Sequence, residues 1–564
     1  MDNLRLILVV SLVFLSLMLY QSWQADYGTK PQPTTLSPVS SAPNSGNKIP
    51  EKAELPTISP QNTADLPTAV REATADRTLK TAGRVSVKTD LFNVELDLQG
   101  GDVRDVQLLK YTLSPDKPDQ FVHLMADQMP NLFVMQSGLL GNNAPNHQSV
   151  FRADQNNYVL ANGTDILEIP LYWENNGVKV TKIYRFKRAS YLIDVDYKLE
   201  NQSGQLWTGR LYSQLQRSKL SVNEDSKLLQ TYLGAALGSP QTSYQKVTFD
   251  DIQKVGANGF LTPEGKVLSE LQPPWNKGWI AMLQHYFVTA LVPPSEQAFN
   301  YYTKSLDGQR LVIGLHGSDM SITNGQQQQI GLKFYIGPKI QEDLANIAHG
   351  LDLTVDYGWF WFIAQPLFWL LKFIHSILGN WGWAIIVLTI IVKGAFYHLS
   401  AASYKSMADM KRLQPRLLAL KERYGDDKTA YNQAMMELYK KEKINPLGGC
   451  LPILIQLPVF IALYWVLIES VEMRHAPFML WLNNLSVADP YFVLPLLMGA
   501  TMFIQHKLNP STGDPIQEKV MLMLPIMFTF FFAFFPAGLV LYWTVSNILS
   551  IAQQWYITKK MGVI

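Results

Sequence analysis

The chain has 564 residues, of which 47% are hydrophobic and 17% charged, whereas a globular protein has about 25% charged residues. Its mean hydropathy is close to zero, so apolar residues must be concentrated in some regions and scarce in others. The net charge of +2 excludes DNA or RNA binding driven by gross basicity. A single cysteine, Cys450, excludes an internal disulfide framework and a cysteine-rich zinc site. We therefore expect separate soluble and lipid-embedded parts.

The first apolar segment runs from Leu4 to Trp23 and is long enough to cross about 30 Å of hydrocarbon as a helix. Arg5 and the amino terminus place positive charge at its start, which favours an N-terminus inside the cell. A cleaved signal peptide is the alternative, but the apolar run exceeds the usual length of about 7 to 15 residues and no small-x-small cleavage site follows. We predict a transmembrane anchor over residues 1–24.

Residues 25–80 have a different composition, rich in Pro, Ser, Thr and Asn and almost free of aromatic residues. Such a segment cannot bury enough apolar surface to offset the entropy lost on ordering. It predicts a disordered linker without chemistry of its own.

Residues 81–350 alternate apolar and polar positions with a period of two. In YLIDVDYKL, from Tyr191, apolar residues alternate with charged ones from Ile193 to Leu199, which is typical of a half-buried strand. Turn signals such as Asn175-Asn176-Gly177 separate these segments. The same pattern recurs in Val85–Leu98, Val178–Phe186, Tyr286–Val292 and Gly331–Ile336. We predict a large all-β sandwich without a helix long enough for a βαβ crossover.

This β region carries no recognisable catalytic motif. It has no HExxH, no histidine pair at metal spacing and no GxSxG. We interpret it as a structural or docking domain. A sugar-modifying enzyme is the alternative, and it would require an outward pocket with converging carboxylates. The histidines are His123, His147, His285, His316 and His349.

Residues 351–564 predict a polytopic helical membrane domain. Residues 357–378 contain Pro366, Lys372 and His375 among many Trp and Phe residues, which favours an interfacial helix on the outer surface. The uncharged stretch Val520–Ile557 is long enough for two crossings, with a hairpin signal at residues 535–538. The predicted spans are 381–400, 446–469, 490–506, 520–535 and 539–557.

Residues 404–443 are the strongly polar segment of this half, with ten Lys or Arg against six acidic residues. The positive-inside rule places them in the cytoplasm. With the anchor included, this gives six transmembrane helices and both termini inside. Apolar positions such as Met407 and Met410 recur every three or four residues, so we expect a helical hairpin. Pro415 should kink or restart its first helix, and residues 425–427 should form the turn and cap the second.

Lys393 is a charge within the otherwise uncharged sequence TIIVKGAFY. A lone charge at that depth costs at least about 2.5 to 3.5 kcal/mol, so it must be hydrated, paired or extended to the membrane surface. We favour a polar, water-containing cavity, with snorkelling as the alternative. Other spans carry polar groups at similar depth, for which hydrogen bonding between helices is the simpler interpretation. These are Thr389, Gln456, Tyr542, Trp543, Ser546 and Asn547.

Several segments are similar to a known family. NPLGGCLPILIQLPVFIALYWVL, from Asn445, and LPIMFTFFFAFFPAGLVLYWTVSN, from Leu524, resemble the signature spans of the YidC membrane protein insertases, relatives of the Oxa-type proteins. DLTVDYGWFWFIAQPLFWLLKFIH and NWGWAIIVLTIIVKG resemble the interfacial helix and first core span of the Gram-negative form. GWIAMLQHYFVTALVPP resembles its periplasmic domain.

The resemblance implies an insertase of the bacterial inner membrane, with its large domain in the periplasm and no cofactor, metal or enzymatic reaction. It would take nascent inner-membrane proteins into a hydrophilic groove open to cytoplasm and lipid. It would then release them sideways among the membrane lipids, alone or with the Sec translocon. The groove would contain Lys393 and the six polar residues named with it. The hairpin would meet clients or the ribosome through Met407, Met410, Lys411, Arg412, Arg416 and Tyr424.

Three features depart from the family pattern. The groove charge is typically Arg, whereas this chain has Lys393, which keeps the charge but loses the bidentate fork. Trp543 stands where related sequences commonly have a second Tyr. Only Lys559 and Lys560 remain of the basic C-terminal tail, so ribosome contact would rest on the hairpin. A small-molecule transporter using Lys393 is a further alternative, but the internal repeats common in transporters are not seen.

Overall fold

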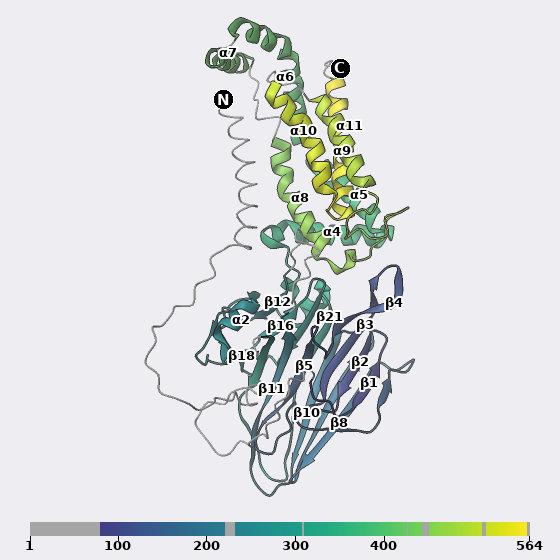
Figure 1. Ribbon diagram of the computed structural model, residues 1–564, viewed down its shortest axis with the longest axis vertical. Helices are drawn as coiled ribbons and strands as arrows, with labels where there is room; N and C mark the ends of the chain where they lie inside the picture. Colours follow the sequence, from purple (N-terminus) through teal and green to yellow (C-terminus); the bar gives the residue numbers. More distant parts are fainter. Residues whose placement is uncertain are drawn as a thin grey trace, which may run out of the picture.

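The computed structural model describes residues 79–219, 232–306, 309–425, 427–442, 451–509 and 515–560. The predicted anchor and residues 25–78 of the predicted linker lie outside the described residues. Two β-sheets form one end of the molecule and a bundle of helices forms the other (Figure 1). We refer to residues 81–350 as the sheet domain and to residues 351–560 as the helical bundle.

The larger sheet has twelve strands in the described part of the chain, and its neighbouring strands are antiparallel except for β1 and β7. Its main path runs β15 (Val267–Leu268), β14 (Gly259–Leu261), β18 (Phe299–Leu306), β19 (Arg310–Gly317), β11 (Trp207–Ser218), β5 (Phe133–Gly141), β3 (Asp102–Ser114), β2 (Phe92–Asp97), β1 (Arg84–Lys88) and β7 (Asn157–Val159). In addition, β20 (Met320–Ile322) pairs with β11 and β4 (Lys117–Met125) pairs with β3.

The smaller sheet has nine strands among the described residues. Their order is β13 (Gln245–Val247), β12 (Gly234–Gly238), β16 (Trp279–Leu283), β17 (Phe287–Val292), β21 (Gln327–Pro338), β10 (Leu192–Asn201), β9 (Val178–Lys187), β8 (Ile166–Asn175) and β6 (Arg152–Ala153). One continuous apolar core includes residues of both sheets, which confirms the predicted β-sandwich.

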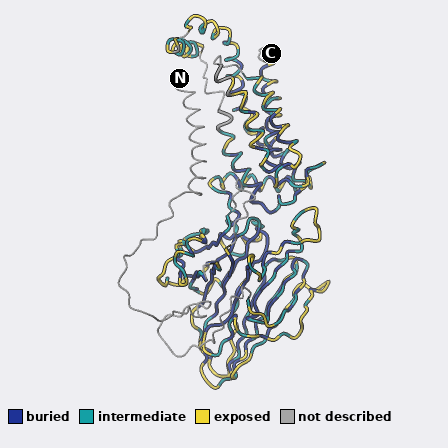
Figure 2. Tube along the Cα trace, in the orientation of Figure 1, coloured by how far each residue is buried: buried dark blue, intermediate teal, exposed yellow. Residues whose placement is uncertain are grey.

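The predicted alternation is confirmed along β10. Ile193, Val195 and Tyr197 are buried, whereas the aspartates between them are only half-buried. The turn between β8 and β9 is also as predicted, because Asn176 and Gly177 both adopt positive φ, at 43° and 75°. Figure 2 shows the buried interior running through both sheets. Two short α-helices accompany these strands in the sheet domain, α2 (Phe249–Val255) and α3 (Gln341–Ile347).

The helical bundle begins with two 3₁₀ turns and continues with helices that pack side by side (Figure 1). Figure 1 places α4 at the base of the bundle next to the sheets, and the α6–α7 hairpin at the opposite end. The elements are η3 (Leu351–Thr354), η4 (Gly358–Phe360), α4 (Trp361–Leu378), α5 (Trp381–Ala395), α6 (Tyr397–Tyr424), α7 (Lys428–Lys441), α8 (Leu451–Glu469), η6 (Val471–Met473), α9 (Val493–Leu508), α10 (Pro515–Phe532) and α11 (Ala537–Lys560).

The helix predicted as the first core span differs from its prediction at its C-terminal end. The helix predicted over 381–400 ends at Ala395, and α6 begins at Tyr397 rather than at residue 404. The two helices are bent by 67° relative to each other. Hydropathy misses this bend because the apolar residues continue to Leu399 while the backbone turns at Phe396.

The hairpin turn largely follows its prediction. The Asp427 Oδ1 atom accepts hydrogen bonds from the backbone N–H groups of Thr429 and Ala430, both at 3.0 Å. This is an N-cap, so the predicted capping of the second helix is confirmed. Pro415 lies inside α6, which continues through it as one helix.

Membrane crossings are only partly testable from helix length and apolarity. Among the described residues, Gly358–Leu378 alone is long and apolar enough to cross by itself, although we predicted an interfacial helix there. Trp381–Ala395 is long enough only together with Tyr397–Tyr424. Ile455–Glu469 and Met521–Phe532 are shorter apolar helices. Residues 1–78 and 443–450 lie outside this test. The count of six crossings therefore stays a prediction.

Candidate functional site

Lys393 lies in the last turn of α5 and contacts α8 and α11. Its Nζ atom donates to the Ser550 hydroxyl on α11 at 2.7 Å and to the Gln456 Oε1 atom on α8 at 3.1 Å. The residue is 9% exposed. The ammonium therefore lies inside the bundle instead of extending to the helix end.

The charge at this position has neutral partners. A lysine ammonium carries three donors, and these two contacts use two of them. Within the described ranges, no carboxylate lies within ion-pair distance of Lys393. Burying an ion without a counter-ion is costly, and hydrogen bonds to neutral oxygens recover only part of that free energy.

Ser550 belongs to this site but was not among the predicted residues. Its hydroxyl accepts from Lys393 and donates to the Ser546 carbonyl oxygen at 2.8 Å. It lies four residues after Ser546 and therefore on the same face of α11. Continuing the polar stripe of the predicted residues by one helical turn would have found it.

Two predicted groove residues make contacts within their own helix or in the apolar core of the bundle. Thr389 is fully buried, and its hydroxyl donates to the Ile385 carbonyl oxygen at 2.6 Å within α5. Tyr542 is 4% exposed, and its ring centroid lies 6.5 Å from that of Phe460. Among the described residues, the hydrogen-bond partners of Lys393 are Gln456 and Ser550, and neither Thr389 nor Tyr542 is one of them.

Two further predicted residues of α11 contact neighbouring helices and not Lys393. Trp543 packs edge-on against Phe460 with centroids 4.5 Å apart, and also meets Phe532 at 4.9 Å. The Asn547 amide donates to the Thr501 hydroxyl on α9 at 3.2 Å. The structure thus brings together Lys393, Gln456 and the Ser546–Ser550 turn, and places the other four predicted residues in neighbouring packing contacts.

The hairpin presents a charged, partly exposed surface (Figure 2). The guanidinium of Arg416 pairs with Glu442, beyond the end of α7, at 2.7 Å, which links the two hairpin helices. Arg412 is also exposed. The other predicted hairpin residues, Met407, Met410, Lys411 and Tyr424, are half-buried. At its base, α6 meets α11 where the Gln553 amide donates to the Tyr397 carbonyl oxygen at 3.5 Å.

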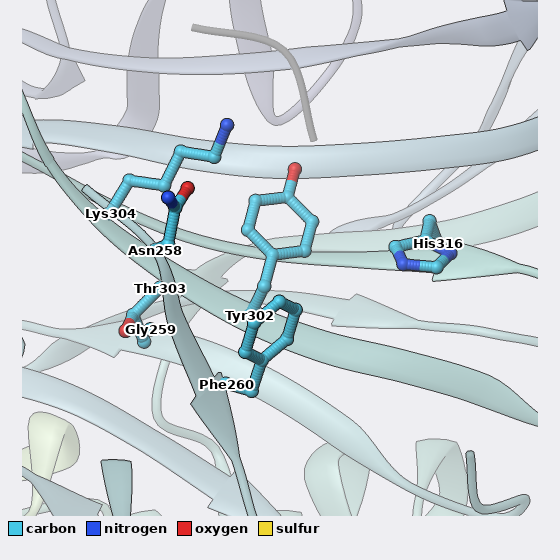
Figure 3. A pocket seen from close by; sticks show the side chains of 7 residues that line it. All are labelled: Asn258, Gly259, Phe260, Tyr302, Thr303, Lys304 and His316. Carbon is cyan, nitrogen blue, oxygen red and sulfur yellow. The ribbon is translucent and has the colours of Figure 1, made fainter. Parts of the chain in front are cut away.

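Two cavities lie away from Lys393. One is an apolar, open cavity of about 370 Å³ between α9 and α10, lined by Phe492, Pro495, Leu496, Ile526, Thr529, Phe530 and Ala533. The other, in the sheet domain, holds about 10 Å³, roughly the space of one water molecule. Figure 3 shows its seven lining side chains, none of which is a carboxylate: Asn258, Gly259, Phe260, Tyr302, Thr303, Lys304 and His316.

Comparison with known proteins shows which families this chain resembles. The model of the YidC periplasmic domain matches residues 84–370, and the model of the 60Kd inner membrane protein matches residues 373–562. The membrane protein insertase YidC of Methylococcus capsulatus is 48% identical over 100% of this chain and 99% of its own length. That of Nitrosococcus oceani is 46% identical over 100% and 99%.

A solved structure, described as an active YidC insertase with the first transmembrane domain resolved, is also similar. It has a TM-score of 0.39 and 18% identity, and the match covers 85% of this chain and 94% of that one. The relatives are named for membrane protein insertion and not for an enzymatic reaction. From the two family models and the full-length relatives, the chain belongs to the YidC family of membrane protein insertases.

Proposed function

We propose that this chain inserts nascent segments of inner-membrane proteins by way of the polar site at Lys393 and releases them sideways into the bilayer. The observation that carries the proposal is the buried ammonium held by Gln456 and Ser550 without a carboxylate among the described residues. Family membership supplies the general activity. The burial and hydrogen bonding of Lys393 support this residue as the place where a client would first be stabilised.

The physical argument concerns the missing counter-ion. An acidic or strongly polar flank of a client brings an anion or dipole to Lys393 and offsets part of the cost of its burial. The apolar remainder of the client then moves onto the lipid-facing helices. Large apolar side chains on α9 and α10 are exposed there, with Leu496 and Ile526 each at 62%. The polar site that a client would enter and the apolar surface by which it would leave thus belong to the same helical bundle.

The orientation that we propose for the protein in the membrane follows from its charge distribution. The basic hairpin and the sheet domain lie at opposite ends of the molecule (Figure 1), as expected if the hairpin is cytoplasmic and the sheets are periplasmic. We include six crossings and cytoplasmic termini in the proposal. We also include cooperation with the Sec translocon, and contact of the hairpin with the ribosome through exposed residues such as Arg412 and Arg416.

The decisive test is client crosslinking from a probe beside Lys393 in the full-length protein. We expect Lys393→Ala and Lys393→Glu to lose both the crosslinks of a nascent single-span client and its insertion. Lys507→Ala is the matched control, because it removes a lysine of the bundle at another place. The Lys507 ammonium lies over the Phe503 ring on α9, 4.9 Å from its centroid. Undiminished insertion without crosslinks at the site would overturn the proposal, and substrate-dependent flux through liposomes would support a transporter instead.

A further inference from the structure

The last residues of α8 and the turn that follows them meet the sheet domain directly. The His285 Nε2 atom, between β16 and β17, donates to the Ile468 carbonyl oxygen at 3.0 Å. The Arg474 guanidinium donates to the Thr112 carbonyl oxygen on β3 at 2.6 Å. A third contact between the two domains lies away from α8 and joins Lys372 on α4 to Glu342 on α3 at 2.8 Å. The end of α8 is therefore anchored to the strands below it.

A buried ion pair lies at the centre of this junction. The Lys339 ammonium, directly after β21, is 4.0 Å from a carboxylate oxygen of Glu469, the last residue of α8. The two side chains are 3% and 6% exposed. Nearby, Lys246 on β13 pairs with Asp356 at 2.5 Å, and these charges act on the first pair.

The signs of these four charges are sorted by domain. Both lysines belong to the sheet domain, and both carboxylates belong to the helical bundle. Burial lowers the pKa of Lys339 to about 8, and the neighbouring Glu469 carboxylate opposes that shift. The buried Lys339 ammonium therefore depends on a carboxylate from the other domain. Buried ion pairs of this kind select one relative placement of two surfaces more than they add stability.

The position of Glu469 connects this junction to the Lys393 site. Glu469 and Gln456 lie on the same helix, thirteen residues apart, which is about 20 Å along the axis. Although Pro458 lies between these two residues, α8 continues through it as one helix from Gln456 to Glu469. A shift of the outer end of α8 therefore displaces Gln456 relative to the Lys393 ammonium that it binds.

We propose that Lys339 and Glu469 are positioning residues for insertion. Their ion pair docks the sheet domain onto the outer end of α8 and thereby holds Gln456 against Lys393. The inference rests on the proposed function of the Lys393 site. It assigns the sheet domain a mechanical part in insertion, as a brace for one helix of the bundle.

The test is a charge exchange in the full-length protein in liposomes. Lys339→Glu and Glu469→Lys each place two like charges at the junction. We expect each to speed hydrogen exchange at residues 466–474 and to lower insertion of a single-span client by about tenfold or more. The double variant Lys339→Glu/Glu469→Lys restores an ion pair. It should therefore recover most of the protection from hydrogen exchange and most of the insertion. Lys187→Glu, which disrupts an exposed pair with Asp194, is the matched control.

Two results would overturn the inference. One is faster exchange at residues 466–474 with unchanged insertion, and the other is a double variant as defective as the single ones. If a charge reversal prevents folding, Glu469→Gln replaces it in the test, because this change keeps the shape of the side chain. Insertion by Glu469→Gln equal to that of the unmodified protein would then count against the inference. Lys393→Ala is measured in parallel. If it lowers insertion and the junction variants do not, the bracing role fails while the proposed function stands.

Discussion

Two buried lysines of this protein have opposite surroundings. Lys339 sits at the junction of the two domains and faces Glu469. Lys393 sits inside the bundle and is held by a hydroxyl and an amide oxygen. A paired charge is satisfied by the protein itself and suits a fixed contact. A charge with neutral partners retains its attraction for an anion from outside, which suits a site that clients enter and leave.

The largest expected effect comes from reversing the charge at Lys393. Lys393→Glu should lower insertion of a client with an acidic flank by about a hundredfold, the equivalent of the roughly 2.5 to 3.5 kcal/mol that a charge costs at this depth. Lys393→Arg keeps the charge and should retain most of the activity. Insertion into liposomes measures both variants. Equal insertion of acidic-flanked and neutral clients by Lys393→Glu would contradict the electrostatic role.

Removing a neutral partner tests how the ammonium is held. Ser550→Ala deletes the 2.7 Å hydrogen bond to Lys393. Because hydrogen bonds to charged groups contribute about 1.5 to 3 kcal/mol, we expect crosslinking of clients beside Lys393 to fall by about tenfold or more. Thr558→Ala is the control on the same helix, since that hydroxyl bonds the backbone of α11 itself. A Ser550→Ala variant that matches this control would show that Ser550 does not hold Lys393.

The junction should weaken in acid through His285. Burial, together with the positive charges of Lys339 and Arg474, lowers the pKa of His285 to about 4 from 6.5. Docking is favoured above pH 6.5 and loses stability as the pH falls towards 4, because only the undocked state takes up the proton. The equilibrium constant for docking should fall by roughly sevenfold between pH 6 and pH 5.

Hydrogen exchange at residues 466–474 follows this change. The carboxylates of Glu469, Asp356 and Glu472 also face the junction, so His285→Asn is needed to isolate the histidine. A pH profile that is the same in this variant and in the unmodified protein would assign the effect to the carboxylates.

The smallest effect is expected at the hairpin. Asp427→Ala removes the cap of α7, which typically costs about 1 kcal/mol. Exchange at the amides of Thr429 and Ala430 should rise by roughly fivefold, with insertion nearly unchanged. Asp409→Ala, on α6, provides the matched carboxylate control. Equal protection in both variants would argue against the cap.

The sequence alone predicted the features that depend on local patterns. Period-two alternation located strands such as β10, and composition separated the sheets from the apolar helices. The hairpin signal at residues 535–538 overlaps the break between α10 and the start of α11. The isolated charge of Lys393 was also visible, because it depends only on its uncharged neighbours in the chain. These properties are determined over a few residues, so one sequence contains them.

Only the tertiary structure decided which distant residues meet. Gln456 and Ser550 reach Lys393 from helices 63 and 157 residues away, whereas Asn547, on the same helix as Ser550, turns towards α9. The bend at Phe396 and the pairing of Lys339 with Glu469 were equally invisible in the sequence. The physical reason is that polar side chains on one helix are equivalent until packing sets the rotation of each helix and buries some of them together.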